Sequence, residues 1–586
     1  MHEFKLWAPR PKRISVQVVC QSRTEVYEMT GPDERGFWRV SVEDAGPGDD
    51  YGFLLDDEKQ PWPDPRSQWQ PNGVHGLSRI YDQKAFHWRD QFWQGPPLTG
   101  AIIYEMHIGT FTREGTFDSA ITKLNELAAL GVTHLEIMPV AAFPGDRGWG
   151  YDGVALFAVT ENYGGPEALK RFVDACHATG LAVLLDVVYN HFGPVGNYTG
   201  KYAPYVTDRH ITPWGDAMNF EEAGSDEVRR FFCDNALMWM RDFHFDGLRL
   251  DAVHEFMDRS ALHFMEQLSA EVDVASATLG RRLVLIAESD LNDPRIVTPR
   301  EAGGYGMDAQ WSDDFHHALF TLLYHEEGGK GYYDDFGTLD KLAKSLTNIF
   351  VYDGVYSKYR KRRHGRPVAG LSAHHFIGFI QNHDQVGNRA TGDRLEQFIG
   401  MAKAKVAAGI VLTAPFTPMI FQGEEFAAST PFQYFADHED EEMAKLVSAG
   451  RKKEFAAFGW DHDSIPDPEK PETFLRSKLN WDEAHEGNHA EMLDWFTKLI
   501  HIRRASPSLN DGDTTHNQIR FDPEKSWLVM DRGQVQILTN LGSQPAEFDV
   551  PDGYKLIAQS QPEVALTGTK IIIPPDTLAI LSGEES

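Results

Sequence analysis

The stretch FDGLRLDAVH, residues 245–254, places Arg249 and Asp251 two positions apart in a run apolar enough for a buried strand. Because side chains alternate across a strand, Arg249 and Asp251 share one face, whereas Leu248 and Leu250 share the other. A buried arginine beside a buried aspartate costs free energy unless the two pair or act on a ligand. The permanent charge of Arg249 would keep Asp251 ionised and oriented, as a nucleophilic carboxylate requires.

Polar residues also close other apolar runs of the chain. They are Asp186, Asn190 and His191 in DVVYNH, Glu288 in LVLIAESD, and Asn382, His383 and Asp384 in FIQNHD. Three carboxylates at one rim suit glycoside hydrolysis: one attacks the anomeric carbon, a second protonates the leaving oxygen, and a third stabilises positive charge on the sugar. Glu288 follows the apolar run LVLIA, so desolvation should raise its pKa, as a general acid requires.

Each of these residues also has a simpler interpretation. A single aspartate at a strand end is more often a turn or cap residue, Arg249 with Asp251 could form a structural ion pair, and Asn382-His383-Asp384 could be a polar loop. Their convergence on successive strand ends favours chemistry. His/Asp/Glu groups such as His316-His317 lack metal-ligand spacing, so no metal site is predicted, although calcium on oxygen ligands stays open. GxSxG and P-loop motifs are absent, and no cofactor is predicted.

The elements that would position these residues alternate along the middle of the chain. Helical patterns such as DSAITKLNELAALG and PEALKRFVDACHATG, each closed by a glycine, separate the apolar runs. Eight such runs alternating with helices predict an α/β fold, a (β/α)8 TIM barrel, over residues 96–504, with its active site at the C-terminal strand ends. The runs cover residues 101–109, 133–140, 181–191, 245–253, 283–290, 307–315, 375–384 and 416–425.

Two β-rich segments flank the predicted barrel. Residues 1–95 contain short alternating or β-branched runs such as ISVQVVC and FWRVSVE, which predict an N-terminal β-sandwich domain. Residues 505–586 contain further strand patterns such as VQILTN and TLAILS, which predict a small C-terminal β-domain. Loop excursions at 192–224 and 426–480 follow the third and eighth strands, and loops of such length are usually functional.

Composition excludes several classes of protein. Asp and Glu number 87 against 56 Lys and Arg, and this net charge of −31 argues against nucleic-acid binding. The three cysteines, Cys20, Cys176 and Cys233, are far apart, so neither a disulfide framework nor a zinc site is indicated. The N-terminus lacks the apolar run of a signal peptide, and no stretch is apolar enough to span a membrane. We therefore expect a cytoplasmic protein with no membrane partner.

Aromatic residues are dense in the loops near the predicted rim. They are Trp149, Tyr151, Tyr198, Tyr202, Tyr205 and Trp214. Most aromatic residues belong to protein cores, but those in Gly-rich loops such as GWGYDG are harder to explain in that way. Sugar rings present apolar faces that stack on aromatic planes, so these loops favour a carbohydrate site.

The motifs DVVYNH, GLRLDAVH, the glutamate of IAESD and FIQNHD resemble, in this order, the four sequence regions of the α-amylase family of glycoside hydrolases. The resemblance implies a retaining hydrolase with a covalent glycosyl-enzyme intermediate. It makes Asp251 the nucleophile, Glu288 the acid/base and Asp384 the transition-state stabiliser. It further implies that substrate is bound by Tyr151, as a stacking platform, and by His191, Trp214, Arg249, His254 and His383.

More specific segments narrow the resemblance within that family. RGWGYDGVALFAV, WSDDFHH, FQGEEFAASTPFQYFADH, GRKKEF and TFLRSKLNW resemble the maltooligosyltrehalose trehalohydrolases, which hydrolyse the α-1,4 bond next to a terminal trehalose. This implies maltooligosyl trehalose as substrate and a functional link to maltooligosyltrehalose synthase, which makes it. Two alternatives are a glycogen branching enzyme and a non-catalytic glucan-binding relative, which would be expected to have lost one of the three carboxylates.

Overall fold

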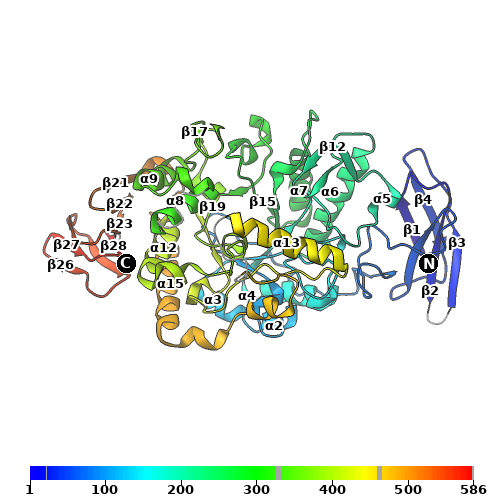
Figure 1. Ribbon diagram of the computed structural model, residues 1–586, viewed down its shortest axis with the longest axis horizontal. Helices are drawn as coiled ribbons and strands as arrows, with labels where there is room; N and C mark the ends of the chain where they lie inside the picture. Colours follow the sequence, from blue (N-terminus) through cyan, green and yellow to red (C-terminus); the bar gives the residue numbers. More distant parts are fainter. Residues whose placement is uncertain (21–22, 325–330, 458–464, 584–586) are drawn as a thin grey trace.

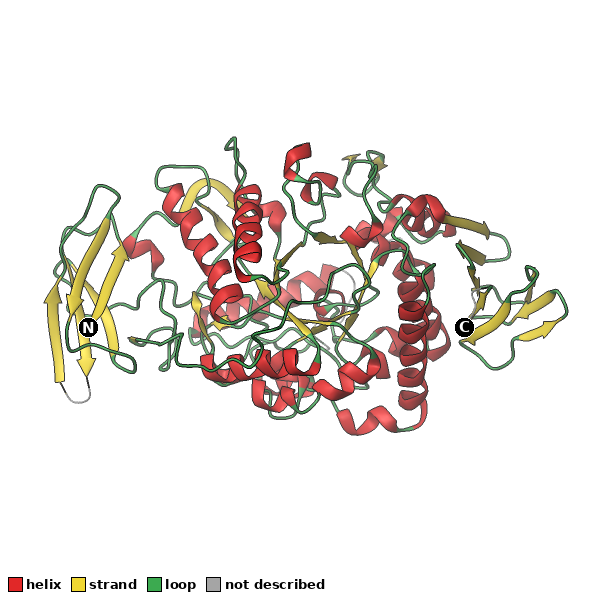
Figure 2. Ribbon diagram, turned by 180° about the vertical axis from the view of Figure 1, so that it is seen from behind, coloured by secondary structure: helices red, strands yellow, loops and turns green. Residues whose placement is uncertain are grey.

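The computed structural model describes residues 1–20, 23–324, 331–457 and 465–583. The described chain forms an elongated molecule in which a barrel lies between two groups of antiparallel strands, one near each terminus (Figure 1). In Figure 2 the helices gather around the central part of the molecule, and strands dominate both ends. Among these residues no helix is both long and apolar enough to cross a membrane.

The central barrel consists of eight parallel strands that close on themselves. In chain order they are β7 (Ile103–Met106), β8 (His134–Ile137), β11 (Ala182–Val187), β14 (Gly247–Leu250), β15 (Val284–Ala287), β16 (Ala309–Trp311), β19 (Phe376–Gly378) and β20 (Thr417–Phe421). β7 pairs with β8 on one side and with β20 on the other, which completes the ring. Each of the eight predicted runs contains one of these strands, so the predicted (β/α)8 barrel is confirmed.

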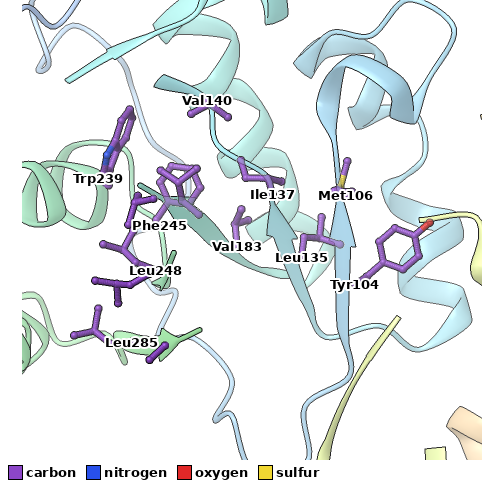
Figure 3. Close-up of a cluster of buried hydrophobic side chains, with 14 of the residues drawn as sticks. Tyr104, Met106, Leu135, Ile137, Val140, Val183, Trp239, Phe245, Leu248 and Leu285 are labelled. Atoms are coloured by element: carbon purple, nitrogen blue, oxygen red, sulfur yellow. The ribbon is translucent and has the colours of Figure 1, made fainter. Parts of the chain in front are cut away.

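Strand alternation divides the barrel residues into two sets. Leu135, Ile137, Val183, Leu248 and Leu285 point outward into the apolar layer shared with the helices, as Figure 3 shows. The inner set contains Ile103, Leu184, Ile286, Trp311 and Met419, which form a separate cluster inside the barrel. Arg249 belongs to the inner set because it alternates with Leu248 and Leu250, as its strand pattern predicts.

Helices cover the barrel between successive strands. They are α1 (Ile108–Phe111), α2 (Phe117–Ile121), α3 (Leu124–Leu130), α4 (Gly165–Thr179), α6 (Ser225–Asp242), α7 (Phe264–Leu279), α8 (Asp313–Leu323), α10 (His383–Gly387), α11 (Leu395–Ile399), α12 (Met401–Thr413) and α15 (Gly487–Ala505). α4 carries Pro166 in its first turn and ends at Gly180, whose φ of 87° is left-handed. Such a glycine closes a helix without the steric cost that other residues incur.

Antiparallel sheets occupy both ends of the molecule. Near the N-terminus β1 (His2–Trp7) pairs with β4 (Phe37–Val42), and a second sheet has the order β3 (Arg23–Glu28), β2 (Ile14–Cys20), β5 (Asp50–Leu55), β6 (Ser78–Arg79). Near the C-terminus the larger sheet has the order β21 (Asn517–Asp522), β22 (Trp527–Arg532), β23 (Val535–Asn540), β28 (Thr577–Ser582), β25 (Lys555–Gln559). The smaller sheet has the order β24 (Ala546–Asp549), β27 (Lys570–Ile573), β26 (Ala565–Thr567). The domain limits at residues 95 and 504 stay predictions.

Three connections extend beyond simple strand-to-helix turns. Residues 192–224 contain α5 (Thr199–Tyr202) and the hairpin β12 (Val206–Thr212)–β13 (Gly215–Met218). Residues 426–480 contain α13 (Glu441–Ala457) and α14 (Pro471–Arg476), with 458–464 outside the described part. A third long connection, from β16 to β19, was not predicted and carries α8, α9 (Leu339–Asn348) and the hairpin β17 (Tyr356–Ser357)–β18 (Arg362–Arg363).

Candidate active site

Arg249 lies at the centre of a charged layer inside the barrel, just below the C-terminal rim. Its side chain is fully buried, and its Nη1 donates to Asp186 at 2.8 and 2.9 Å and to Asp251 at 2.9 Å. Its Nη2 lies 3.2 Å from Glu288 Oε2, and the guanidinium sits 4.1 Å from the centroid of Trp311. One cation therefore contacts three carboxylates from three neighbouring strands, which orients all of them.

Asp251 follows the last residue of β14, so it emerges at the rim on the inner face of the barrel. Its Oδ1 accepts from Arg249, and its Oδ2 accepts from Asn190 Nδ2 at 3.1 Å. The next residue, Ala252, adopts a left-handed conformation with φ of 43°, and its backbone N–H donates to Glu288 Oε2 at 2.6 Å. A non-glycine residue in this conformation is strained, and such strain clusters at functional sites.

Glu288 follows β15 directly, and its titration is strongly perturbed by this environment. Burial raises its pKa to about 8, although Arg249 acts in the opposite direction, and the nearby charges of Asp251 and Asp384 raise it further. The raised value agrees with the expectation drawn from the apolar run before it. At neutral pH Glu288 is therefore mostly protonated and can donate a proton.

Asp384 lies in the first turn of α10 and is the most exposed of the three carboxylates, with 40% of its side chain accessible. Its Oδ1 accepts from Asn388 Nδ2 at 3.0 Å and lies 3.6 Å from His383 Nε2. Its charge contributes to the raised pKa of Glu288, and contacts through His383 and Tyr151 link it to Asp186 beside Arg249. The structure thus brings Asp251, Glu288 and Asp384 to one rim.

Tyr151 and His383 form a stacked pair beside these carboxylates. Their rings lie 5.1 Å apart at 23°, and the Tyr151 hydroxyl is 2.8 Å from His383 Nε2 and donates to Asp186 at 2.6 Å. Trp149 presents its ring at 90° to His383, at 5.5 Å. The loop GWGYDG therefore supplies an aromatic wall to the same rim.

His191 lies on the other side of the Tyr151 backbone. Its Nε2 is 3.1 Å from the Tyr151 carbonyl oxygen, and its ring stacks on Trp214 at 4.8 Å and 4°. Trp214, between β12 and β13, is 49% exposed, so its outer face is open to a ligand. His254 follows Asp251 on a 3-10 turn, and its buried Nδ1 has no hydrogen-bond partner within the described residues.

The nine predicted site residues therefore lie on strand ends or in the loops that follow them. Trp214 contacts the others through His191, and His254 is placed near them by its position three residues after Asp251. Sequence reasoning missed two residues of the site, Glu105 and Trp311, and it placed Asp186 at a strand end without giving it a role. Asp186 stands in the quoted motif DVVYNH, and the alternation of β11 was the signal that could have placed it beside Arg249. Within the described ranges no group of three or more His, Cys, Asp or Glu is arranged to hold a metal ion.

The loop excursion after β20 contacts residues that support this site. Arg147, in the loop before Trp149, forms two hydrogen bonds with Asp437 at 2.9 and 3.0 Å, and Trp149 Nε1 donates to the Gln433 carbonyl at 2.9 Å. On α13, Arg451 donates to Asn388 Oδ1 at 2.9 Å, and Asn388 in turn holds Asp384. The excursion therefore contacts the supports of both the aromatic wall and a carboxylate.

Comparisons with known proteins agree with this geometry. A family model described as the alpha amylase catalytic domain matches residues 81–208. The chain is 47% identical to a malto-oligosyltrehalose trehalohydrolase from Rhizobium sp. (strain M-11), covering 99% of this chain and 97% of the relative. It is 46% identical to a protein of the same name from Mycobacterium tuberculosis, with 100% of both chains covered.

A solved structure has nearly the same fold. The crystal structure of a putative alpha amylase from Salmonella typhimurium superimposes with a TM-score of 0.90 at 35% identity, covering 99% of this chain and 97% of that one. The barrel, the rim carboxylates and the full-length relatives above 40% identity lead to one conclusion. The chain is a glycoside hydrolase that belongs to the malto-oligosyltrehalose trehalohydrolase family, within the alpha-amylase group.

Proposed function

We propose that this chain hydrolyses the α-1,4-glucosidic bond next to the terminal trehalose of maltooligosyl trehalose and releases trehalose. The names of its full-length relatives support the substrate. The observation that carries the chemistry is the contact of one buried cation, Arg249, with both Asp251 and Glu288. It orients both carboxyl groups at the same rim, and Glu288 is the one that carries a proton at neutral pH, as the acid of a double displacement must.

In the first step Asp251 attacks the anomeric carbon, and a bond from its carboxylate oxygen to that carbon replaces the glycosidic bond. Glu288 transfers its proton to the leaving oxygen, so trehalose departs as a neutral alcohol. Asp384 stabilises the positive charge that develops on the sugar ring while the glycosidic bond breaks and the bond to Asp251 forms. In the second step Glu288 takes a proton from water, the water oxygen attacks the anomeric carbon, and Asp251 is released. The anomeric configuration is retained because it inverts twice.

The decisive experiment compares maltooligosyl trehalose with linear maltodextrin, each incubated with the enzyme and analysed for products. We expect free trehalose from the first substrate. New α-1,6 branches would indicate the branching reaction instead, which is the weaker candidate because the chain is only 27% identical to a 1,4-alpha-glucan branching enzyme from Bacillus cereus over 75% of its length. We also propose that the substrate comes from maltooligosyltrehalose synthase.

The variant Asp251→Ala separates catalysis from binding. We expect it to lose trehalose release by at least about 10⁴-fold, since the nucleophile that splits the reaction into two steps is gone, while the substrate still binds. Calorimetric titration of the variant with maltooligosyl trehalose measures the binding. An unmutated enzyme that binds this substrate without any hydrolysis would instead point to a glucan-binding relative.

A further inference from the structure

Glu105 is a buried carboxylate that the catalytic scheme above does not use. It lies on β7 on the inner face of the barrel, with 1% of its surface exposed. Its Oε2 accepts the backbone N–H of His383 at 2.9 Å, and its Oε1 lies 2.5 Å from His383 Nδ1. One side chain from the first barrel strand thus holds both the main chain and the ring of His383.

The other ring nitrogen of His383 also faces an acceptor. His383 Nε2 is 2.8 Å from the hydroxyl oxygen of Tyr151, and that hydroxyl donates its own proton to Asp186. Asp186 is bonded to Arg249 and is therefore an acceptor for the Tyr151 proton. The Tyr151 oxygen is then left to accept from His383. With acceptors at both nitrogens, the imidazole satisfies every contact only when both nitrogens carry protons.

We propose that Glu105 is a positioning residue that holds His383 as an imidazolium cation, with its Nε2–H directed at Tyr151 and toward Asp384. This inference rests on the proposed function, because it assigns Tyr151 and Asp384 to the substrate side of the site. The cation locks the stacking face of Tyr151 and places positive charge beside Asp384. Glu105 acts on the reaction only through His383 and touches no reacting atom.

The charges around His383 agree with a cationic ring. Burial alone would lower its pKa, but Glu105 and Asp384 raise it to about 9, against the opposing charge of Arg249. Two other titratable groups face it. Burial lowers the pKa of His107 to about 3, so that ring is neutral at pH 7, and burial raises the pKa of Glu136 well above its usual value. Tyr151 and Asp186, from the neighbouring loop and from β11, complete the set.

The first test compares Glu105→Gln with Glu136→Gln. Glu136 is the residue paired with Glu105 on the neighbouring strand, it is equally buried, and neither of its carboxylate oxygens has a hydrogen-bond partner in the described part of the chain. It is thus a matched control. We expect Glu105→Gln to lower kcat/KM for trehalose release about 100-fold at pH 7.5, since misplacing a positioned group costs about that much. The control should stay within about twofold.

The pH profile separates this role from a merely structural one. In Glu105→Gln the ring of His383 loses its counter-charge, so its pKa falls and the ring is already neutral at pH values where the wild-type ring is still charged. The deficit in kcat/KM should therefore shrink toward pH 5.5, where the ring is protonated again, and widen toward pH 8. A deficit of the same size at every pH would overturn the proposal. A loss in Glu136→Gln equal to that in Glu105→Gln would also overturn it.

A second measurement needs no active variant. In wild-type enzyme labelled with ¹⁵N-histidine, the His383 signals are those that disappear in His383→Gln. We expect both ring nitrogens to be protonated at pH 7.5, and a neutral ring there would overturn the proposal even if Glu105→Gln failed to fold. Failure of the wild type to release trehalose would instead refute the proposed function, and the ring signals would still decide the role of Glu105.

Discussion

The substitution Glu288→Gln should stabilise the protein while it abolishes activity. The folded chain raises the pKa of Glu288 from 4.5 to about 8, with burial as the largest cause. Glutamine has the shape of the protonated acid but never ionises. It therefore keeps the uncharged state that the buried site favours, and loses the proton that the leaving oxygen needs.

The size of the effect depends on pH. A carboxyl group with a raised pKa in the folded state contributes stability that is complete below its unfolded pKa and is lost as pH rises through its folded pKa. Between pH 4.5 and about pH 8 ionisation of Glu288 lowers the free energy of unfolding by about 5 kcal/mol, and about 3 kcal/mol of this has been lost by pH 7. The free energy of unfolding of Glu288→Gln should thus exceed that of the wild type by close to nothing at pH 4 and by several kcal/mol at pH 8.

Melting temperatures of both proteins, measured from pH 4 to pH 9, test this reasoning. We expect the advantage of Glu288→Gln to widen steadily with pH, and an exposed glutamate changed in the same way, Glu301→Gln, to give no such trend. An advantage that is constant across the range, or a variant that is less stable at pH 8, would show that burial does not control the protonation of Glu288.

Two further outcomes are expected. A methyl group on Gly387 would lie 2.1 Å from Trp149 Cζ2, so Gly387→Ala should destabilise the fold by about 1–3 kcal/mol and lower kcat/KM. Calorimetry and kinetics measure the two effects, and an unchanged melting temperature would contradict this expectation. Burial alone would lower the pKa of His177, but its hydrogen bonds to Asp246 and Asp90 raise it. The stability that protonated His177 contributes is therefore complete below pH 6.5, and it is lost as pH rises through the raised pKa of the folded state. His177→Gln should thus lower the free energy of unfolding more at pH 6 than at pH 9.

The barrel could be predicted because its strands are short, apolar and separated by glycine-terminated helices. Parallel strands buried on both faces produce continuous apolar runs, which stand out in a sequence. The rim carboxylates could be predicted for a related reason: a charged residue directly after such a run lies at the end of a buried strand, and strand ends meet at the rim of a barrel. Asp251 and Glu288 each follow their strand without an intervening residue, and the structure places both at the rim.

Other parts of the site could not be predicted because their signal lies in pairs of distant residues. Glu105 sits within the run AIIYEMHIG, and its partner His383 lies 278 positions away in the chain. Nothing near Glu105 distinguishes it from Glu136, which also alternates into the barrel but has no bonded partner in the described segments. The connection between β16 and β19 was missed because its helices resemble ordinary barrel helices, and its hairpin β17–β18 has only two residues in each strand.

The closure of the barrel has a consequence for how the protein is made. β7 is synthesised early, but one of its two neighbours, β20, lies about 300 residues further along. At a usual translation rate of roughly 10 residues per second, the ribosome needs about half a minute to cover that distance. Throughout that interval β7 has an unpaired edge, and Asp251 and Glu288 emerge well before Asp384. Each molecule is thus inert until its last barrel strand is complete, and a premature stop codon upstream of Thr417 abolishes the enzyme rather than weakening it.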